Sequence, residues 1–498
     1  MTTTPSSTTG SISSAGIGSG LDVKSIITSL MAVEAQPLQL LQNKASTVNT
    51  EISAVGQIQS LTSALSDKAH KLSSTSLWTQ TTSSTSDNTV VTADTAGGTA
   101  AAGDYQVSVQ QLAQGQTATL AVPAAALSAG SIVIQLGTYK TDAATPPNTT
   151  FLAAGAASPA ITIGAGDTSL ASIRDKINAA GAGVSASIIT DASGSRLSLR
   201  STTTGAINGF QITATEAVDD GNPATGLSAL NFDGSTGAAN SQLTLNQFAQ
   251  DAKATVNGIS VTSSTNKLSN VSDGLSLTLL KKSDTPVDVS VATDTASMQK
   301  AIADFVSAYS AVQSYISQQT KYDSSTAVAA GTARTDSPLQ GDPSVIGFQN
   351  QLRSIVTTTS TTSSMFSRLS DLGIAVQKDG TLSIANQTKL TSALSHPDEL
   401  SKLFTTYGTT KENTGIAVRF ASLADNAVTV NGSLYSRAAG LRGELSRNQK
   451  QQDDMQVHLD ATQARLTEQY QKLDTTMSQM NALSSYVSQQ VTLMQKAA

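Results

Sequence analysis

The sequence predicts an α+β multidomain protein, with a helical coiled-coil stalk formed by both chain ends and antiparallel β-rich domains inserted between. Apolar residues recur at helical spacing near both ends of the 498-residue chain, whereas apolar and polar residues alternate through much of the middle. The chain is also too long for one core, because an ordinary domain holds about 100–200 residues. The expected order is therefore helix, β, β, mixed, helix.

Changes in this periodicity divide the chain into four predicted parts. These are a terminal leg region that is flexible or helical (1–40 and 465–498), a helical stalk domain with a small hairpin (41–84 and 296–464), a β domain (85–114 and 246–295) and an inserted β-rich domain (115–245).

The N-terminal helix follows a stretch rich in Ser, Thr and Gly, residues 1–20, which we expect to be disordered in isolation. Pro37 interrupts the first apolar cluster, and proline is tolerated in the first turn of a new helix. From there apolar residues recur mostly at spacings of three and four to Leu72, so the helix should end near Leu77.

Strand periodicity begins after this helix. Tyr105, Val107 and Val109 alternate with polar residues, and Asn257-Gly258 lies between two short β runs, which is a strong hairpin signal. Residues 161–199 read as a β-α-β-β unit whose helix starts at Asp167-Thr168-Ser169 and is ended by Gly181. The middle of the chain is therefore folded and is not a linker.

The helical period returns after residue 294. Over 298–316 apolar residues follow one another at alternating spacings of four and three residues, which is the pattern of a heptad seam. Further along the chain, Asp379-Gly380 predicts the turn of a β-hairpin. A final helix over 441–494 carries apolar residues at intervals of seven, and about 50 residues would span roughly 75 Å. The predicted stalk residues are Leu41, Val48, Ile52, Val55, Met298, Ile302, Phe305, Tyr309, Val312, Ile316 and Leu459.

The apolar stripes at the two chain ends extend beyond the segments that the chain itself can cover. A helix with an apolar stripe needs a partner, so these residues should be loosely ordered in the free protein and buried in an assembly. The alternative is that the two ends pair only with each other. The predicted contact residues of the leg are Ile26, Ile27, Leu30, Met31, Leu466, Leu473, Met477, Met480, Val487, Val491 and Met494.

The composition and motifs favour a structural protein over an enzyme. Charged residues are 13% and aromatic residues 4%, so the cores are thin and poorly suited to a deep catalytic cavity. Net charge is −6, which disfavours nucleic acid as a partner, and the absence of Cys excludes disulfides and thiolate metal sites. No phosphate-binding loop or nucleophile elbow occurs, and the Asp219-Asp220 and Asp453-Asp454 pairs read as solvated surface. We expect no catalytic residue, cofactor or metal.

Membrane and targeting signals are also missing from the sequence. No apolar run approaches 18 residues, so no membrane-spanning helix and no membrane partner are expected. The first Lys is Lys24, and the N-terminus has no basic and apolar regions of a secretory signal. We therefore expect either a cytoplasmic protein or export by a route without a cleavable signal peptide.

Six segments, which lie at both ends of the chain and in most of its interior, carry a family resemblance. They are residues 12–42 (ISSAGIGSGLDVKSIITSLMAVEAQPLQLLQ), 103–118, 169–205, 368–384 (RLSDLGIAVQKDGTLSI), 396–404 (HPDELSKLF) and the closing heptad helix that begins near 433–441 (SLYSRAAGL). Together they resemble the bacterial flagellar filament-capping family, also called hook-associated protein two; the third segment is similar to a module of flagellins and hook-associated proteins.

The resemblance implies an extracellular protein at the tip of the flagellar filament, exported unfolded through the flagellar channel and needed for motility. It implies a homo-oligomeric ring, roughly a pentamer or hexamer, which promotes folding and insertion of flagellin. It also implies contacts of the leg region with flagellin, a neighbouring hook-associated junction protein and a cytoplasmic export chaperone at the C-terminal helix.

Two alternatives share parts of this pattern. Another axial flagellar protein, such as a hook–filament junction protein, would also pair terminal helices around a β middle; the mixed region 341–430 argues against flagellin. A tip adhesin that binds host mucin is the second alternative, because Thr- and Ala-rich β domains at a tip would be exposed to the host and would serve cell adhesion.

Overall fold

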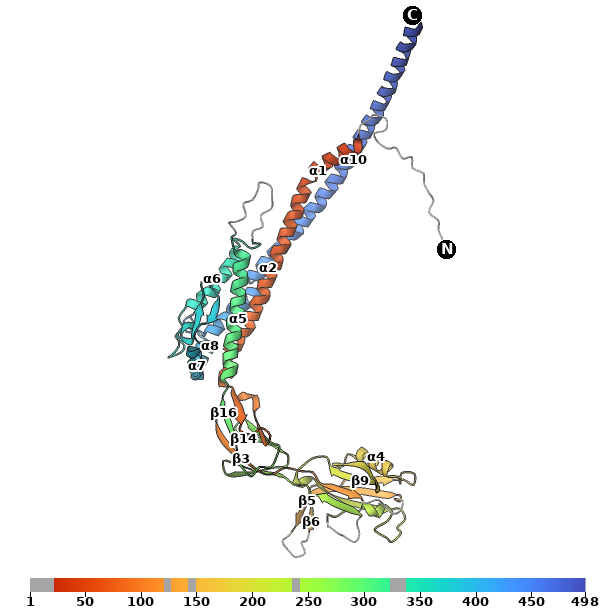
Figure 1. Cartoon of the computed structure of the whole chain (residues 1–498), viewed down its shortest axis with the longest axis vertical. Helices are drawn as coiled ribbons and strands as arrows, with labels where there is room; N and C mark the ends of the chain where they lie inside the picture. The colour runs from red at the N-terminus through yellow and green to blue at the C-terminus, as the bar shows by residue number, and fades with distance from the viewer. Residues whose placement is uncertain (1–21, 121–126, 142–148, 235–241, 323–336, 498) are drawn as a thin grey trace. The chain divides into compact units, whose positions relative to one another are not determined.

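The structure, a computed structural model, describes residues 22–120, 127–141, 149–234, 242–322 and 337–497. The chain forms two compact units: a helical unit from residues up to Trp78 and from Ser297 onward, and a β unit over Thr79–Ala296. Figure 1 shows helices at both ends of the chain and strands in the middle. The predicted α+β class with antiparallel sheets is confirmed. Within the described residues, no helix has both the length and the apolarity to cross a lipid bilayer.

The helical unit is built mainly from long helices. Its elements are α1 (Val23–Glu34), α2 (Gln36–Ser73), α3 (Thr75–Thr79), α5 (Thr295–Thr320), α6 (Pro343–Thr357), η4 (Leu369–Leu372), β17 (Ile374–Val376), β18 (Leu382–Ile384), α7 (Gln387–Leu394), α8 (Pro397–Thr405), α9 (Ile416–Val428) and α10 (Ser433–Ala497).

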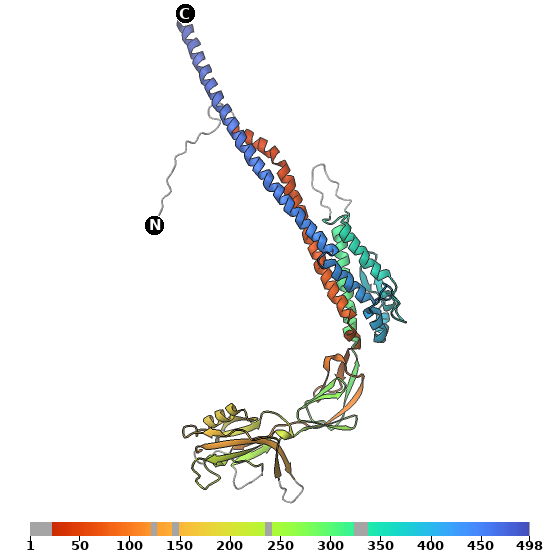
Figure 2. The same ribbon diagram turned by 180° about the vertical axis from the view of Figure 1, so that it is seen from behind.

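Helices from the two chain ends run side by side, as both Figure 1 and Figure 2 show for α1, α2 and α10. Pro37 lies in the first turn of α2, as expected. An ion pair of 3.0 Å joins Lys44 of α2 to Glu444 of α10. The 65-residue helix α10 begins at Ser433, eight residues before the predicted start, because Asn431 and Gly432 end the preceding turn.

Aromatic side chains fix α5 in the core of the helical unit. Phe305 and Tyr309 of the heptad seam contact Phe420 of α9, with ring centroids 5.1 and 5.7 Å apart. Trp78 stacks on Phe404 at 5.2 Å, and its indole nitrogen donates to the Leu72 carbonyl oxygen. Trp78 therefore anchors the end of α2 and α3 by packing.

The β unit contains two separate hydrophobic cores. The first lies between the five-stranded sheet β1-β16-β3-β12-β13 and the three-stranded sheet β14-β15-β2. The strands of these sheets are β1 (Thr81–Thr85), β2 (Val91–Thr95), β3 (Gly103–Gln111), β12 (Ala252–Val256), β13 (Ile259–Ser263), β14 (Lys267–Ser272), β15 (Leu275–Leu279) and β16 (Val287–Thr293).

The second core of the β unit lies among two four-stranded sheets and helix α4 (Leu170–Ala180). One sheet has the order β11-β4-β9-β8; the other has the order β10-β5-β6, with β7 also paired to β5. The strands are β4 (Thr117–Leu120), β5 (Gly130–Thr141), β6 (Thr149–Ala153), β7 (Ile161–Ile163), β8 (Val184–Asp191), β9 (Gly194–Ser201), β10 (Gly209–Glu216) and β11 (Leu243–Gln247).

Three predicted local motifs are confirmed. Strands β12 and β13 pair with Val256 opposite Ile259, and Asn257 and Gly258 both have positive φ, which a two-residue hairpin turn requires. The β-α-β-β unit is present as β7, α4, β8 and β9; Ser169 caps α4, and Gly181 ends it in the left-handed conformation. Strands β17 and β18 form the hairpin predicted around residues 379–380.

Candidate assembly surface

The predicted stalk residues lie in the interior of the helical unit, with two exceptions. Leu41 and Ile52 are only partly buried. The remaining stalk residues are buried: Val48, Val55, Met298, Ile302, Phe305, Tyr309, Val312, Ile316 and Leu459. All of these except Leu459 belong to one continuous core.

The N-terminal leg residues lie on α1, which packs against α10. Asp22 caps this helix by accepting a hydrogen bond from the backbone N–H of Ser25 at 3.0 Å. Ile26, Ile27 and Met31 are half-buried and Leu30 is exposed, whereas the buried residue is Val23, which the predicted contact set omitted. Helix α1 therefore uses much of its apolar face against the chain itself.

The end of α10 is different, because its apolar residues remain exposed. Leu466 and Met477 are half-buried, but the other predicted contact residues are between 45% and 70% exposed. These exposed residues are Leu473, Met480, Val487, Val491 and Met494. Figures 1 and 2 show no other described element beside the last turns of α10.

Three further exposed apolar residues widen this surface: Leu483, Tyr486 and Leu493. At 3.6 residues per turn, Tyr486 and Leu493 point roughly 140° to 160° away from Leu473. The heptad register through Leu473, Met480 and Val487 does not include them, although the sequence does contain a signal: no charged residue occurs between Asp474 and Lys496. The end of α10 is apolar over too wide an arc for a single partner helix to cover.

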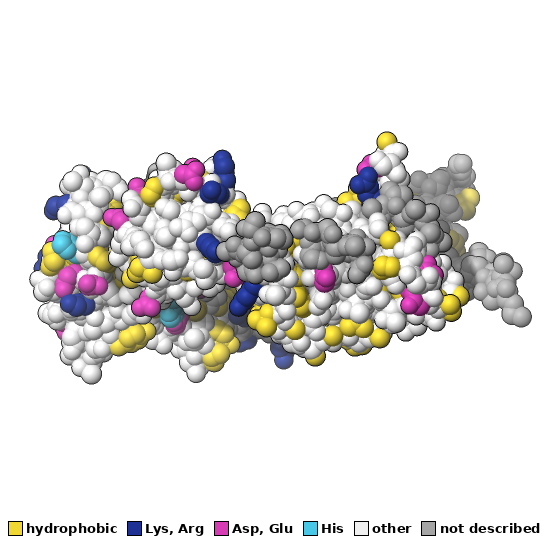
Figure 3. All heavy atoms as spheres, turned by 90° about the horizontal axis from the view of Figure 1, so that it is seen from below, with side chains coloured by type: hydrophobic (Ala, Val, Ile, Leu, Met, Phe, Trp, Pro, Cys, Tyr) yellow, Lys and Arg dark blue, Asp and Glu magenta, His cyan; other side chains and the backbone are white. Residues whose placement is uncertain are grey.

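Charged groups are sparse over the rest of the surface as well. On the face drawn in Figure 3, Lys, Arg, Asp and Glu side chains are scattered singly or in small groups among uncharged residues. On α10 itself, Asp453, Asp454 and His458 are exposed on the helix surface.

The glycine-rich segment GIGSG near the N-terminus, residues 16–20, lies outside the described residues.

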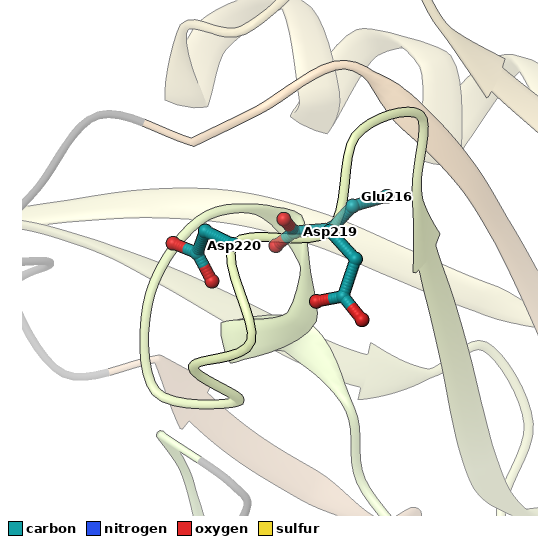
Figure 4. Close-up of side chains that lie close together, drawn as sticks. All are labelled: Glu216, Asp219 and Asp220. Carbon is teal, nitrogen blue, oxygen red and sulfur yellow. The ribbon is translucent and has the colours of Figure 1, made fainter.

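One cluster of carboxylates contains the Asp219-Asp220 pair, which the sequence places on the solvated surface. Oxygen atoms of Glu216, Asp219 and Asp220 lie within 4.8 Å of one another, and Figure 4 shows them around one loop. Asp219 accepts from the backbone N–H of Gly221 at 2.9 Å, and Asp220 accepts from the Thr225 hydroxyl at 2.6 Å. The Thr225 hydrogen bond lowers the pKa of Asp220. These carboxylates therefore stabilise the loop, and we assign no metal to them.

Family models match most of the chain. The model described as "Flagellar hook-associated protein 2 C-terminus" matches residues 249–482, and the corresponding N-terminal model matches residues 19–116. A third model, "Flagellin hook IN motif", matches residues 152–203, which include the β-α-β-β unit.

Relatives with similar sequences extend over nearly the whole chain. Flagellar hook-associated protein 2 of Escherichia coli K12 is 32% identical over 489 residues, which cover 96% of this chain and 98% of that protein. The B-type flagellar hook-associated protein 2 of Pseudomonas aeruginosa is 32% identical and covers 94% of both chains. A crystal structure of domains of the flagellar cap protein from Escherichia coli matches with a TM-score of 0.56 and 29% identity, covering 78% of this chain and 99% of that one.

Proposed function

The chain belongs to the flagellar hook-associated protein 2 family, and on this premise we propose that it caps the distal end of a bacterial flagellar filament. In this role it assembles with copies of itself and acts on flagellin subunits as they are added beneath the cap. The premise rests on relatives that match at both ends of the chain and throughout its interior. These relatives are structural proteins, and we propose no enzymatic activity.

The observation that carries the mechanism is the exposed apolar end of α10. From Leu473 onward the helix has about 25 residues, or roughly 37 Å, with an apolar surface that no described part of the chain covers. Such a surface is normally buried against a partner in water. Its residues carry no charge between Asp474 and Lys496, which favours hydrophobic contacts that can be broken and remade as subunits are inserted.

We propose a separate role for each of the four parts of the chain. The legs, residues 1–40 and 465–498, contact flagellin; the stalk, 41–84 and 296–464, supports them; the β domain, 85–114 and 246–295, and the inserted domain, 115–245, mediate contacts in the ring. We propose a ring of roughly five or six copies. An export chaperone at the C-terminal helix, a junction protein at the filament base and secretion without a cleavable signal peptide complete the scheme.

The test uses a strain that lacks the gene and is complemented with variants. The triple variant Leu473→Asp, Met480→Asp, Val487→Asp places three charges on the exposed apolar stripe. We expect short or absent filaments by electron microscopy and flagellin released into the medium. The purified variant should keep the melting temperature of the native chain, because the three side chains are already exposed.

A matched control carries the same three charges on the side of α10 that holds none of its exposed large apolar residues, as Gln471→Asp, Ser485→Asp, Thr492→Asp. These positions are also exposed and point roughly 100° to 160° away from Leu473. The control should grow filaments of normal length. Normal filaments from the first triple variant would contradict the proposed role of the leg.

A further inference from the structure

A cavity of about 450 Å³ lies in the helical unit, beside Arg419. Its walls come from the second half of α6, the loop that precedes α9 and one side of α9 itself. Hydroxyl groups line it on all three sides, among them Ser354, Thr410 and Ser422, and Lys411 adds a second positive charge. Within the described part of the chain, none of the lining side chains is acidic. Apolar surface makes up most of the cavity wall, and its polar part consists of these hydroxyl groups, the Gln351 amide and the two basic side chains.

Arg419 is buried without a partner in the wall of this cavity. It is 8% exposed, and among the described residues its three guanidinium nitrogens have no hydrogen-bond acceptor. A buried charge of this kind is costly unless an opposite charge or an acceptor compensates it. Burial lowers the pKa of Arg419, and the field of the Glu412 carboxylate opposes that shift without forming an ion pair.

The missing partner has a defined chemistry. A guanidinium group offers a planar fork of N–H donors that matches the two oxygens of a carboxylate. The nitrogens are shielded from solvent, so binding of an anion from the cavity requires the Arg419 side chain to turn toward it. The neighbouring hydroxyl groups donate to the remaining lone pairs of the bound oxygens.

We propose that this cavity binds a carboxylate group, held by Arg419 and Lys411. The group belongs either to a small organic anion or to an acidic side chain of a neighbouring protein chain. This inference is independent of the proposed capping function, because it concerns the isolated chain and is tested without filaments.

The binding test uses the purified full-length chain and three probes at matched ionic strength. These are succinate, N-acetylated triglutamate and inorganic phosphate, each compared with sodium chloride. We expect a saturable rise in melting temperature, and a binding isotherm by calorimetry, with at least one of the two carboxylate probes. Tighter binding of succinate would identify a small anion, and tighter binding of triglutamate would identify an acidic side chain.

Substitutions test the assignment of residues. Arg419→Met should weaken carboxylate binding by about tenfold or more, since charge-assisted hydrogen bonds are lost, while Arg442→Met on the exposed surface of α10 should not. Without ligand, Arg419→Met should melt at or above the native temperature, because an unpaired buried charge is removed. Lys411 is exposed, so Lys411→Met should weaken binding with no loss of folding.

Three outcomes would overturn the proposal. The first is that neither succinate nor triglutamate gives a saturable rise in melting temperature or a binding isotherm. The second is that phosphate raises the melting temperature as much as, or more than, both carboxylate probes. The third is that Arg419→Met and Glu412→Gln each lower the melting temperature by a similar amount and the double variant lowers it no further. That result would mean that Glu412 pairs with Arg419 in solution, so that the site is already filled.

Discussion

Glu399 shows how a single carboxylate can hold a loop in place. From the first turn of α8 it accepts hydrogen bonds from the Ser363 hydroxyl at 2.6 Å and from the Ser364 backbone N–H at 2.8 Å, and it pairs with Lys402 at 2.8 Å. The Lys402 hydrogen bond, followed by those from Ser363 and Ser364, lowers the pKa of Glu399 from 4.5 to about 2. Stability of this part of the helical unit is therefore linked to pH.

The sign of that linkage gives a prediction. Because the pKa is lower in the folded state, ionised Glu399 stabilises the fold above pH 4.5, and the contribution is lost as pH falls from 4.5 toward 2. Glu399→Gln should therefore lower the urea midpoint at pH 6 and reduce its further decline between pH 4.5 and pH 3. An equal decline in Glu399→Gln and in the native chain would refute this role. The exposed carboxylate Glu34, replaced by Gln, serves as the control.

Three helices are joined at Arg437 of α10. Its guanidinium pairs with Glu51 of α2 at 3.1 Å and with Asp342, whose other carboxylate oxygen caps α6 through the backbone N–H of Ser344. Asp342 is buried, and burial raises the pKa of Glu51. Removing Arg437 would thus leave two shielded carboxylates without their cation.

Arg437→Met should therefore lower the free energy of unfolding by about 2–4 kcal/mol at pH 7, somewhat less than for a fully buried pair because Arg437 is partly exposed. Lys44→Met, which breaks the exposed pair with Glu444, should cost under about 1 kcal/mol. Denaturant unfolding measures both values. Equal costs for the two variants would show that the network around Arg437 does not join the helices as described.

Local motifs could be predicted from sequence, whereas long-range pairings could not. The turn at Asn257-Gly258 and the helix between Ser169 and Gly181 depend on residues next to one another, so their signals are self-contained. The pairing of β5 with β10 was not predicted, because it joins segments about 70 residues apart. Thr and Gln residues within these strands also make their alternation of buried and exposed positions harder to recognise. The buried positions are Ile132, Ile134, Phe210, Ile212 and Ala214.

The candidate surface was predictable in its position but not in its width. A heptad search finds the stripe through Met480 and Val487, because both follow one helical face. A search in that register passes over Leu483, Tyr486 and Leu493, whose exposure depends on which helices the fold places nearby. It also cannot show that α1 buries Val23 against its own chain and so keeps less apolar surface for partners.

At the scale of the whole molecule, the two units differ in how they use the chain. The helical unit combines segments from both ends, whereas the β unit is continuous over Thr79–Ala296. Every residue of the two β cores comes from within that range. The β unit should therefore fold without the helices, which suits a protein whose ends are left to form an assembly.

A fragment of residues 79–296 tests this. It should be soluble and should unfold cooperatively, with a far-ultraviolet circular dichroism spectrum dominated by β structure. A fragment that lacks a cooperative transition would show that the helical unit supplies something essential to the β cores.

The central claim is that the apolar end of α10 is open in the isolated chain and covered at the filament tip. Because the chain contains no Cys, Met480→Cys creates a unique thiol on the exposed stripe, and its rate of reaction with a maleimide reports on coverage. We predict a rate close to that of a free thiol in the isolated chain and a rate at least tenfold lower in caps on filaments. Equal rates in the two states would contradict the account.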